Sequence, residues 1–238
     1  MAEHATQRII AVMNQTHDVG KTTITANLGV ILAEMGYRVL MLDLDPQADL
    51  SRQFGVPETQ SGMDRLLKND VSISEVTLSL TNHLSLIASG PDLFLYDQLT
   101  PSINMGVQLK QLLTSTMPAD ADIILIDCAA LSGLLGTNAV LAATDMLIPV
   151  SAGHGALRGM IKMLPVLQRV SKLGPDSLRL WLCLNRLPDG NDFAYQFGTL
   201  LTQYFPKRVL KTVIYDNESA NPADYQSLAN DLLMGRAD

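Results

Sequence analysis

A glycine-lysine-threonine triplet near the start of the chain is the first group of residues that could do chemistry. Gly20, Lys21 and Thr22 follow an apolar run at 9–13 and precede a helical pattern at 24–33. In a loop between a strand and a helix, backbone N–H groups and the positive end of the helix dipole attract an anion. The lysine ammonium then reaches the outer phosphates of a nucleotide, and the threonine hydroxyl holds Mg²⁺. We therefore predict an ATP or ADP site at Asp18, Val19, Gly20, Lys21, Thr22 and Thr23.

Three aspartates are further candidates for the site, because they lie at or near the ends of strand-like runs. Asp43 and Asp45 lie at the end of one apolar run, and Asp127 lies at the end of another. In a parallel sheet the ligand lies at the carboxyl ends of the strands, so these carboxylates are expected to meet the glycine-lysine-threonine loop. Phosphoryl transfer to water needs a positioned nucleophile, a metal on the phosphates and cations near the developing charge. The alternative for each aspartate is a carboxylate that only caps a turn.

The order and spacing of these motifs resemble those of ParA/Soj-type ATPases, the partition relatives of the MinD group. The segment 39–49 (Val-Leu-Met-Leu-Asp-Leu-Asp-Pro-Gln-Ala-Asp) is similar to their switch I, and 123–128 is similar to their Walker B strand. The resemblance spans roughly residues 7 to 215. Asn185 and Arg186, directly after a strand pattern, resemble the pair that contacts adenine in this family. A polar turn is the alternative there.

This resemblance implies a role for each residue of the site. Lys21 and Asp45 would be the catalytic residues, with Asp45 orienting the attacking water. Thr22 would bind Mg²⁺ directly. Asp127 would act on the metal through a bound water, and Asp43 would support the metal side. The implied cofactors are therefore ATP or ADP with Mg²⁺.

The loop departs from the family pattern directly before Val19. The family has Lys-Gly-Gly there, and its lysine reaches the partner's nucleotide across an ATP-bound dimer. This chain has Thr16, His17 and Asp18 instead. Asp18 places a carboxylate near the triphosphate, where like charges repel. Two interpretations stay open: a slightly bent loop that still binds ATP, or a loop that binds nucleotide poorly.

Strand and helix patterns alternate along the chain, which predicts an α/β fold. We expect one P-loop NTPase domain over 1–238, with a mostly parallel, doubly wound sheet and helices on both faces. Residues 1–7 are expected to be a disordered N-terminus. The length of 238 residues and a hydrophobic content of 47% suffice for one large core. Strands are expected near 8–14, 38–43, 84–88, 122–127, 145–150, 179–184 and 209–214, and helices near 21–35, 61–69, 105–116, 133–143, 155–173, 193–204 and 223–234.

Charge is distributed unevenly. The chain has a net charge of −7, yet residues 158–211 hold nine basic and three acidic side chains, a net charge of +6. The resemblance implies nonspecific DNA binding by an ATP-bound dimer through this region, with Lys207, Arg208 and Lys211 as candidates. A solvated basic face is the alternative. No apolar run approaches the roughly 18–20 residues of a membrane span, and 225–234 lacks lysine and arginine. We expect a cytoplasmic protein with no membrane anchor, at the nucleoid if it binds DNA.

Three functions are compatible with these residues. The first is an ATPase that dimerises with bound ATP, hydrolyses it slowly and positions a cargo such as a plasmid, a chromosome or a protein assembly. An unidentified partner protein would stimulate or recruit it. The second is a nucleotide-binding adaptor with negligible turnover that docks on a protein partner. The third is a relative whose nucleotide site no longer works.

Overall fold

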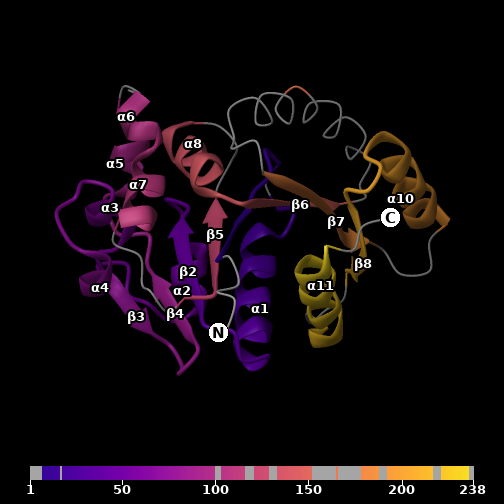
Figure 1. The fold of residues 1–238 in the computed structure, drawn as a ribbon, viewed down its shortest axis with the longest axis horizontal. Helices are drawn as coiled ribbons and strands as arrows, with labels where there is room; N and C mark the ends of the chain where they lie inside the picture. Colours follow the sequence, from indigo (N-terminus) through magenta and orange to yellow (C-terminus); the bar gives the residue numbers. More distant parts are fainter. Residues whose placement is uncertain are drawn as a thin grey trace, which may run out of the picture.

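The computed structural model describes residues 7–16, 18–99, 103–115, 121–128, 133–151, 165, 178–187, 192–216 and 221–235 (Figure 1). His17, the helix expected near 155–173 and residues 1–6 of the expected disordered N-terminus lie outside these ranges. Gln7 does not belong to a disordered extension, because its side chain donates a hydrogen bond to the Ala121 carbonyl at 2.7 Å. Within the described ranges, no helix is long and apolar enough to cross a membrane.

Eight strands of the described residues form one sheet in the order β3-β4-β2-β5-β1-β6-β7-β8. The central strands are apolar and buried along their whole length, as expected for strands that helices cover on both faces. All neighbours run parallel except β3 and β4. The strands are β1 (Arg8–Val12), β2 (Val39–Leu44), β3 (Thr77–Ser79), β4 (Leu84–Ile87), β5 (Ile123–Cys128), β6 (Asp145–Ser151), β7 (Arg179–Leu187) and β8 (Val209–Tyr215).

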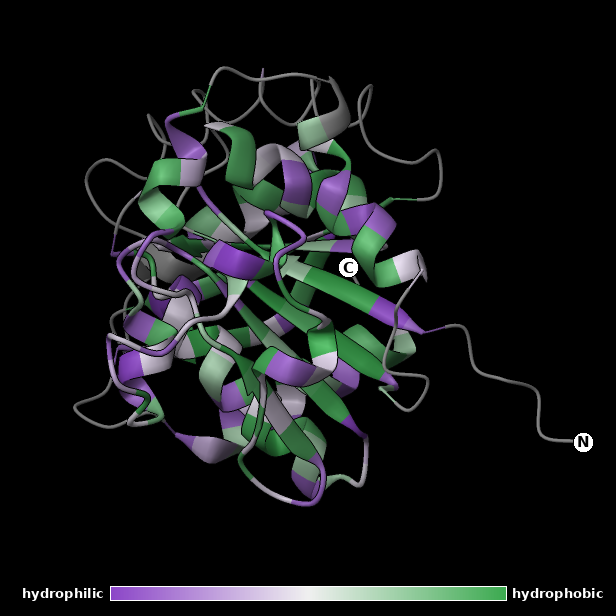
Figure 2. Cartoon of the chain, turned by 90° about the vertical axis from the view of Figure 1, so that its left-hand side faces the viewer, coloured by the Kyte–Doolittle hydropathy of each residue, from purple (hydrophilic) through white to green (hydrophobic). Residues whose placement is uncertain are grey.

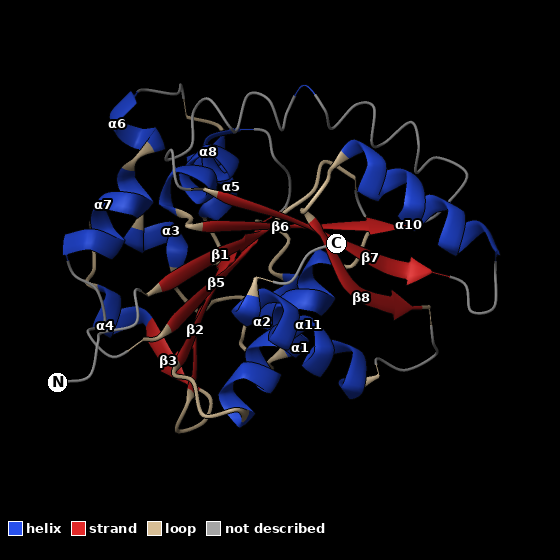
Figure 3. Ribbon diagram, turned by 45° about the vertical axis from the view of Figure 1, so that its right-hand side comes forward, coloured by secondary structure: helices blue, strands red, loops and turns tan. Residues whose placement is uncertain are grey.

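The longer helices lie on the two faces of the sheet (Figure 3), and all of them except α11, which follows β8, connect successive strands. Shorter helices, of four or five residues, fill the connections between β2 and β5. The helices are α1 (Lys21–Glu34), α2 (Asp49–Gln53), α3 (Met63–Leu66), α4 (Ile73–Val76), α5 (Leu93–Asp97), α6 (Ile103–Gly106), α7 (Gln108–Ser115), α8 (Gly133–Ala142), α10 (Asp192–Tyr204) and α11 (Pro222–Met234).

Alternate residues of each strand enter two separate hydrophobic clusters, one on each face. In β1, Ile9 and Ala11 pack with the cluster that includes α3, α7, α8 and α10, whereas Ile10 and Val12 pack with the cluster that includes α1 and α11. This is the period-2 arrangement of strand side chains. Figure 2 shows the result, hydrophobic strands enclosed by helices that carry hydrophilic residues on their outer sides. The predicted fold class, a mostly parallel sheet with helices on both faces, is confirmed.

Several predicted boundaries were wrong. The helix expected near 61–69 is only α3, and the helix expected near 105–116 is divided into α6 and α7. The sequence patterns also did not predict β3, which has three residues and pairs antiparallel at the sheet edge, or the short helices α2, α4 and α5. Elements of one turn or less bury too few residues to show a clear hydrophobic period.

A buried carboxylate fixes the amino end of the sheet. Asp145, the first residue of β6, accepts hydrogen bonds from Arg8 at 2.7 Å, from Arg179 at 2.8 Å and from the Trp181 indole N–H at 2.8 Å. Arg8 also donates to the Leu232 carbonyl in α11. Burial raises the pKa of Asp145, but the bonds from Arg8 and Trp181 outweigh it and hold the pKa below its usual value. Asp145 therefore ties β1, β6, β7 and α11 together.

Candidate functional site

The loop predicted to bind phosphate lies between β1 and α1, at residues 13–20, and is called the phosphate-binding loop below. Helix α1 begins at Lys21 with Gly20 as its N-cap, and no side chain of the described residues caps its first N–H groups. These N–H groups are left for an anion, as at other helix N-termini that bind phosphate. The buried Lys21 turns back over the loop, and its ammonium donates to the Thr16 carbonyl at 3.2 Å. Asn14 fixes the start of the loop, since its side chain accepts from the Thr16 N–H at 2.9 Å.

The loop has a left-handed backbone at Asp18, a conformation that favours glycine. Asp18 has φ of +58° and Gly20 has φ of +81°, both in the left-handed region. Aspartate tolerates this region better than most side-chain-bearing residues. A Cβ at Gly20 would lie 2.4 Å from the Asn185 amide nitrogen, so no larger residue fits there without displacing Asn185.

Asp127 lies at the carboxyl end of β5, beside the helix start. It is fully buried, and its Oδ2 atom has no hydrogen-bond partner among the described residues. Burial and the neighbouring Asp43 raise its pKa to about 7, against a bond from the Thr22 hydroxyl that lowers it. A buried carboxylate oxygen without a donor is unfavourable unless a ligand satisfies it. A hydrated Mg²⁺ beside Thr22 meets this need, because Mg²⁺ keeps several waters and one or two protein ligands.

Asp43 lies beside Asp127 on the neighbouring strand, since the two are register partners in β2 and β5. Its Oδ2 accepts from the Ser51 hydroxyl at 2.6 Å and the Ser51 N–H at 2.8 Å, and its Oδ1 accepts from the Asp45 N–H at 3.2 Å. Burial raises the pKa of Asp43 to about 6, although the Ser51 bonds lower it. In this structure Asp43 therefore holds the turn after β2, next to the place where the metal would be bound.

Asp45 is the first residue after β2 and is almost completely buried. Its Oδ1 accepts from the Gln47 N–H at 2.9 Å, and its backbone carbonyl accepts from the Ser89 hydroxyl at 2.8 Å. Ala48 then takes a left-handed conformation at φ of +55° before α2 begins. The turn that carries Asp45 is thus fixed by its own backbone and by the loop after β4.

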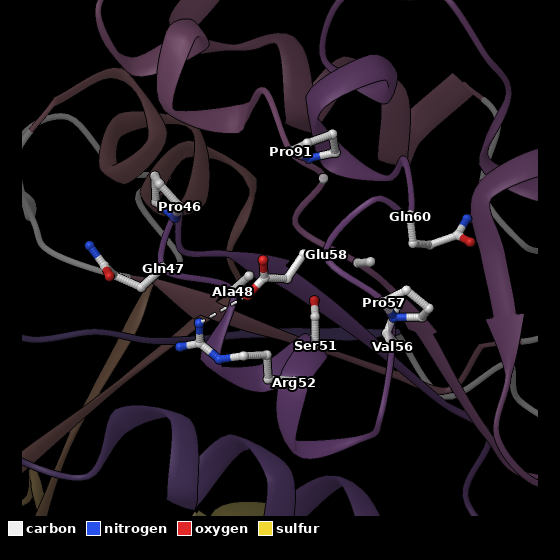
Figure 4. Close-up of a pocket in the computed structure, with 12 residues that line it drawn as sticks. Pro46, Gln47, Ala48, Ser51, Arg52, Val56, Pro57, Glu58, Gln60 and Pro91 are labelled. Carbon is white, nitrogen blue, oxygen red and sulfur yellow. Dashed lines mark ion pairs between the residues drawn. The ribbon is translucent and has the colours of Figure 1, made fainter.

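A pocket of about 330 Å³ opens on the outer side of this turn (Figure 4). Its walls come from the segment after β2, from α2 and from the loop after β4. Arg52 and Glu58 pair across it at 3.8 Å, and Ser51 lies at its wall with its hydroxyl bonded to Asp43. The residues that line it are Pro46, Gln47, Ala48, Ser51, Arg52, Val56, Pro57, Glu58, Gln60, Ala88, Gly90 and Pro91.

The site residues predicted between 18 and 127 thus converge at the carboxyl ends of the central strands β1, β2 and β5. Lys21 and Thr22 begin α1, and Asp43, Asp45 and Asp127 lie at or directly after the carboxyl ends of β2 and β5. Among the described residues, no three His, Cys, Asp or Glu side chains are arranged to hold a metal by themselves.

Comparison with known proteins identifies the family. A protein-family profile described as an AAA domain matches residues 7–180. The chain is 33% identical over 215 residues to the sporulation initiation inhibitor protein Soj of Bacillus subtilis, a match that covers 88% of this chain and 85% of that protein. It is 31% identical over 211 residues to the chromosome-partitioning ATPase Soj of Thermus thermophilus, covering 88% and 82%. The chain belongs to the ParA/Soj-type P-loop ATPases.

A solved structure of similar fold carries a nucleotide and a metal. Cobyrinic acid a,c-diamide synthase from Mycobacterium smegmatis, with bound ADP and magnesium, matches with a TM-score of 0.86 and 27% identity. The match covers 95% of this chain and 94% of that one. One fold with one nucleotide site therefore serves proteins of different names, so the function of a ParA/Soj-type chain has to be argued from its own residues.

Asn185 and Arg186 lie beneath the phosphate-binding loop of this ParA/Soj-type ATPase, at the carboxyl end of β7. The Asn185 amide donates to the Val19 carbonyl at 2.7 Å, and the Arg186 guanidinium donates to the Asp18 carbonyl. Arg186 itself has φ of +53°. The polar-turn alternative for this pair is too weak a description, because both side chains reach the loop across 166 and 168 residues of sequence.

The basic region is divided in space. Lys207 and Arg208 are exposed in the turn before β8, and Lys211 is exposed on β8 itself. They lie toward the amino end of this strand, whereas the phosphate-binding loop is at the carboxyl ends. Arg179 and Arg186 instead donate hydrogen bonds within the chain, to Asp145 and to the Asp18 carbonyl. Four further basic residues of the region, Arg158, Lys162, Arg169 and Lys172, lie outside the described ranges.

Three hydroxyl residues of the site were not predicted. Ser51 and Ser89 form a buried chain of hydrogen bonds between Asp43 and Asp45, in which the Ser89 N–H donates to the Ser51 hydroxyl at 3.1 Å. Nothing in their sequence surroundings distinguishes them from turn residues. Thr25 lies 3.4 Å from Asp127 through its hydroxyl. Its position one turn after Lys21 and Thr22 was a usable signal, since residues three and four apart share a helix face.

Proposed function

We propose that this chain is an ATPase that binds ATP with Mg²⁺, dimerises in the ATP-bound state, hydrolyses it slowly and positions a cargo. The cargo would be a plasmid, a chromosome or a protein assembly. One observation carries the proposal: among the described residues, the buried Oδ2 of Asp127 has no hydrogen-bond partner, and it lies beside a helix start whose N–H groups no described side chain caps. An anion and a cation are both needed there, and Mg²⁺-ATP supplies both.

Nucleotide would be held by the loop and the start of α1. Lys21 would leave the Thr16 carbonyl and donate to phosphate oxygens, while the N–H groups of Gly20 to Thr23 surround the anion. Thr22 would be the direct ligand of Mg²⁺, with Asp127 bonded to a metal-bound water and Asp43 behind it. When bound, Mg²⁺ supplies positive charge to the phosphate oxygens. We expect Asp127 to be deprotonated in that state, because a nearby cation favours the carboxylate.

Hydrolysis would depend on Asp45. Its carboxylate lies on the fixed turn after β2, and we assign it the orientation of the attacking water. Turnover should be slow, because Thr16 offers no cation for the developing charge on a partner's nucleotide. A cation supplied in that way contributes about 10³ to 10⁵ in rate in other phosphoryl-transfer enzymes. A partner protein that stimulates or recruits the dimer would then set its lifetime.

DNA binding completes the proposed cycle. Lys207, Arg208 and Lys211 form an exposed basic surface on an otherwise acidic chain. Dimerisation doubles the number of phosphate contacts, so ATP would control retention on DNA without sequence preference. The protein would then act in the cytoplasm, at the nucleoid.

An adaptor with negligible turnover is not favoured, because Lys21, Thr22, Asp43, Asp45 and Asp127 are all present and brought together. Single-turnover and steady-state assays of the purified full chain with Mg²⁺-ATP test the proposal. We expect slow phosphate release that EDTA abolishes. Tight ATP binding with no phosphate release over many hours would instead identify an adaptor, and no binding at millimolar ATP would refute the proposal.

A further inference from the structure

Two backbone carbonyls of the phosphate-binding loop are held from outside by neighbouring side chains of β7. The Asp18 carbonyl accepts from Arg186, and the Val19 carbonyl accepts from Asn185 at 2.7 Å. Asn185 is buried, whereas Arg186 is exposed. These are the two peptide groups directly before the N-cap of α1.

Each bond fixes the direction of an N–H group. A trans peptide is planar, with its C=O and N–H pointing to opposite sides. Holding the Asp18 carbonyl outward therefore turns the Val19 N–H to the other side, and holding the Val19 carbonyl does the same for the Gly20 N–H. Successive N–H groups that point into one concavity form an anion-binding nest.

This chain has a particular need for such support. Asp18 adopts φ of +58° with a side chain present, a conformation that favours glycine. Without an outside contact, the peptide after Asp18 is free to rotate toward the conformations that aspartate prefers. Asn185 also occupies the space next to Gly20, because a Cβ there would lie 2.4 Å from its amide nitrogen.

We propose that Asn185 and Arg186 are positioning residues that brace the phosphate-binding loop, and that the left-handed Asp18 makes this chain depend on the brace. The inference rests on the proposed nucleotide site and deepens it. The brace acts on the phosphate half of the ligand. The role expected for this pair from resemblance, contact with adenine, acts on the base half. The two roles therefore differ in what the residues recognise.

A ligand without a base separates the two roles. We would measure binding of Mg²⁺-ATP and of Mg²⁺-tripolyphosphate by isothermal titration calorimetry to the full chain. The variants are Arg186→Ala, Arg186→Gln (which keeps a donor without the charge), and Lys110→Ala on the exposed face of α7 as a control. The brace predicts that Arg186→Ala weakens both ligands by the same factor, about tenfold for one lost charge-assisted hydrogen bond. A smaller loss is expected for Arg186→Gln and none for Lys110→Ala.

The adenine role predicts another pattern. If Arg186→Ala weakens ATP but leaves tripolyphosphate unchanged, the side chain recognises the base and the brace is wrong. Unchanged affinity for both ligands overturns it as well. In an Asp18→Gly background the loop no longer carries a strained residue, so the effect of Arg186→Ala on tripolyphosphate should shrink to threefold or less, about 0.6 kcal/mol. An equal loss in both backgrounds would refute the dependence on Asp18.

A measurement without nucleotide separates this inference from the proposed function. Hydrogen–deuterium exchange of the N–H groups at 18–22 should accelerate in Arg186→Ala, because the loop then samples other conformations. If wild-type protein binds neither ligand, the proposed function fails while this exchange still tests the brace. Exchange identical to wild type would overturn the brace regardless of binding.

Discussion

Ser51 is the main hydrogen-bond partner of Asp43, because its hydroxyl and its N–H both donate to the same carboxylate oxygen, at 2.6 and 2.8 Å. The hydroxyl in turn accepts from the Ser89 N–H, and the Ser89 hydroxyl donates to the Asp45 carbonyl. The Asp43 carboxylate and the turn that carries Asp45 are therefore joined through two buried serines. The pocket of Figure 4 touches this connection at Ser51.

Ser51→Ala removes one of the three hydrogen bonds that lower the pKa of Asp43, the bond from the Ser51 hydroxyl. That pKa, already raised to about 6 by burial, should rise further, so a larger fraction of the carboxyl is protonated at neutral pH. We expect the acidic limb of the ATPase pH–rate profile to move up by about one pH unit, given about 1.5 kcal/mol for a bond to a charged group. Ser115→Ala, exposed at the end of α7, is the control. A profile that does not move would mean that Asp43 need not ionise.

Lys21→Ala should abolish the stabilisation that Mg²⁺-ATP gives to the folded protein. Wild type at a ligand concentration about 100 times its dissociation constant gains about 2.7 kcal/mol, a rise in Tm of roughly 5–10 °C for a chain of this size. Lys68→Ala, an exposed lysine after α3, should keep the full shift. Differential scanning fluorimetry measures both. A wild-type melting curve unmoved by millimolar ATP would show that the site does not bind nucleotide.

Asp45→Asn should slow hydrolysis about 10²-fold or more while ATP affinity stays within about twofold, because the carboxylate is assigned to the water rather than to the phosphates. The asparagine keeps an oxygen for the Gln47 N–H, so the turn itself should survive. Asp45→Ala removes that oxygen too and is expected to be at least as slow. Turnover that persists in both variants would refute the assigned role.

Charge reversal at Lys207, Arg208 and Lys211 should weaken retention on DNA without changing ATP affinity. Six such contacts in a dimer make affinity fall roughly 10³-fold between 50 and 200 mM salt, and the variant should lose most of this dependence. Fluorescence anisotropy with unrelated duplexes, with and without ATP, measures it. Reversal at Lys68 and Lys110 is the control. Equal binding without nucleotide would contradict the dimer requirement, and no binding with ATP at low salt would favour an acidic protein partner for this surface.

Arg8→Ala should make the protein sensitive to acid. The pKa of Asp145 is lowered in the folded state, so its contribution to stability is present above the unfolded value near 3.8 and is lost as pH falls through the folded pKa. Without Arg8 that pKa rises, and acid unfolding should begin at higher pH. Removing one partner of a buried ion pair costs about 3 kcal/mol. The exposed pair Arg38–Asp122 supplies the control, since Arg38→Ala should cost about 1 kcal/mol or less in urea unfolding at pH 7.

The sequence allowed us to predict the parts of the site that lie on long elements. Asp43 and Asp127 lie near the ends of strands with clear apolar runs. Their meeting at the carboxyl ends of these strands therefore followed from the parallel arrangement alone. What could not be predicted depends on contacts between loops. Ser51 meets Ser89 across 38 residues, and Arg186 meets Asp18 across 168, through short segments without hydrophobic periodicity. Such contacts depend on side-chain geometry after folding, which one sequence does not encode in any local pattern.

The cluster around Asp145 has a consequence for how the molecule transmits a signal. It holds the amino ends of β1, β6 and β7 against α11. Lys207 and Arg208 lie at the same end of the strands, opposite the predicted nucleotide site. A sheet held in this way resists bending. We therefore expect a rearrangement at the carboxyl ends of the strands to leave the shape of the basic surface unchanged. Under the proposed cycle, the number of copies joined, rather than a change of shape within one copy, would signal to DNA that ATP is bound.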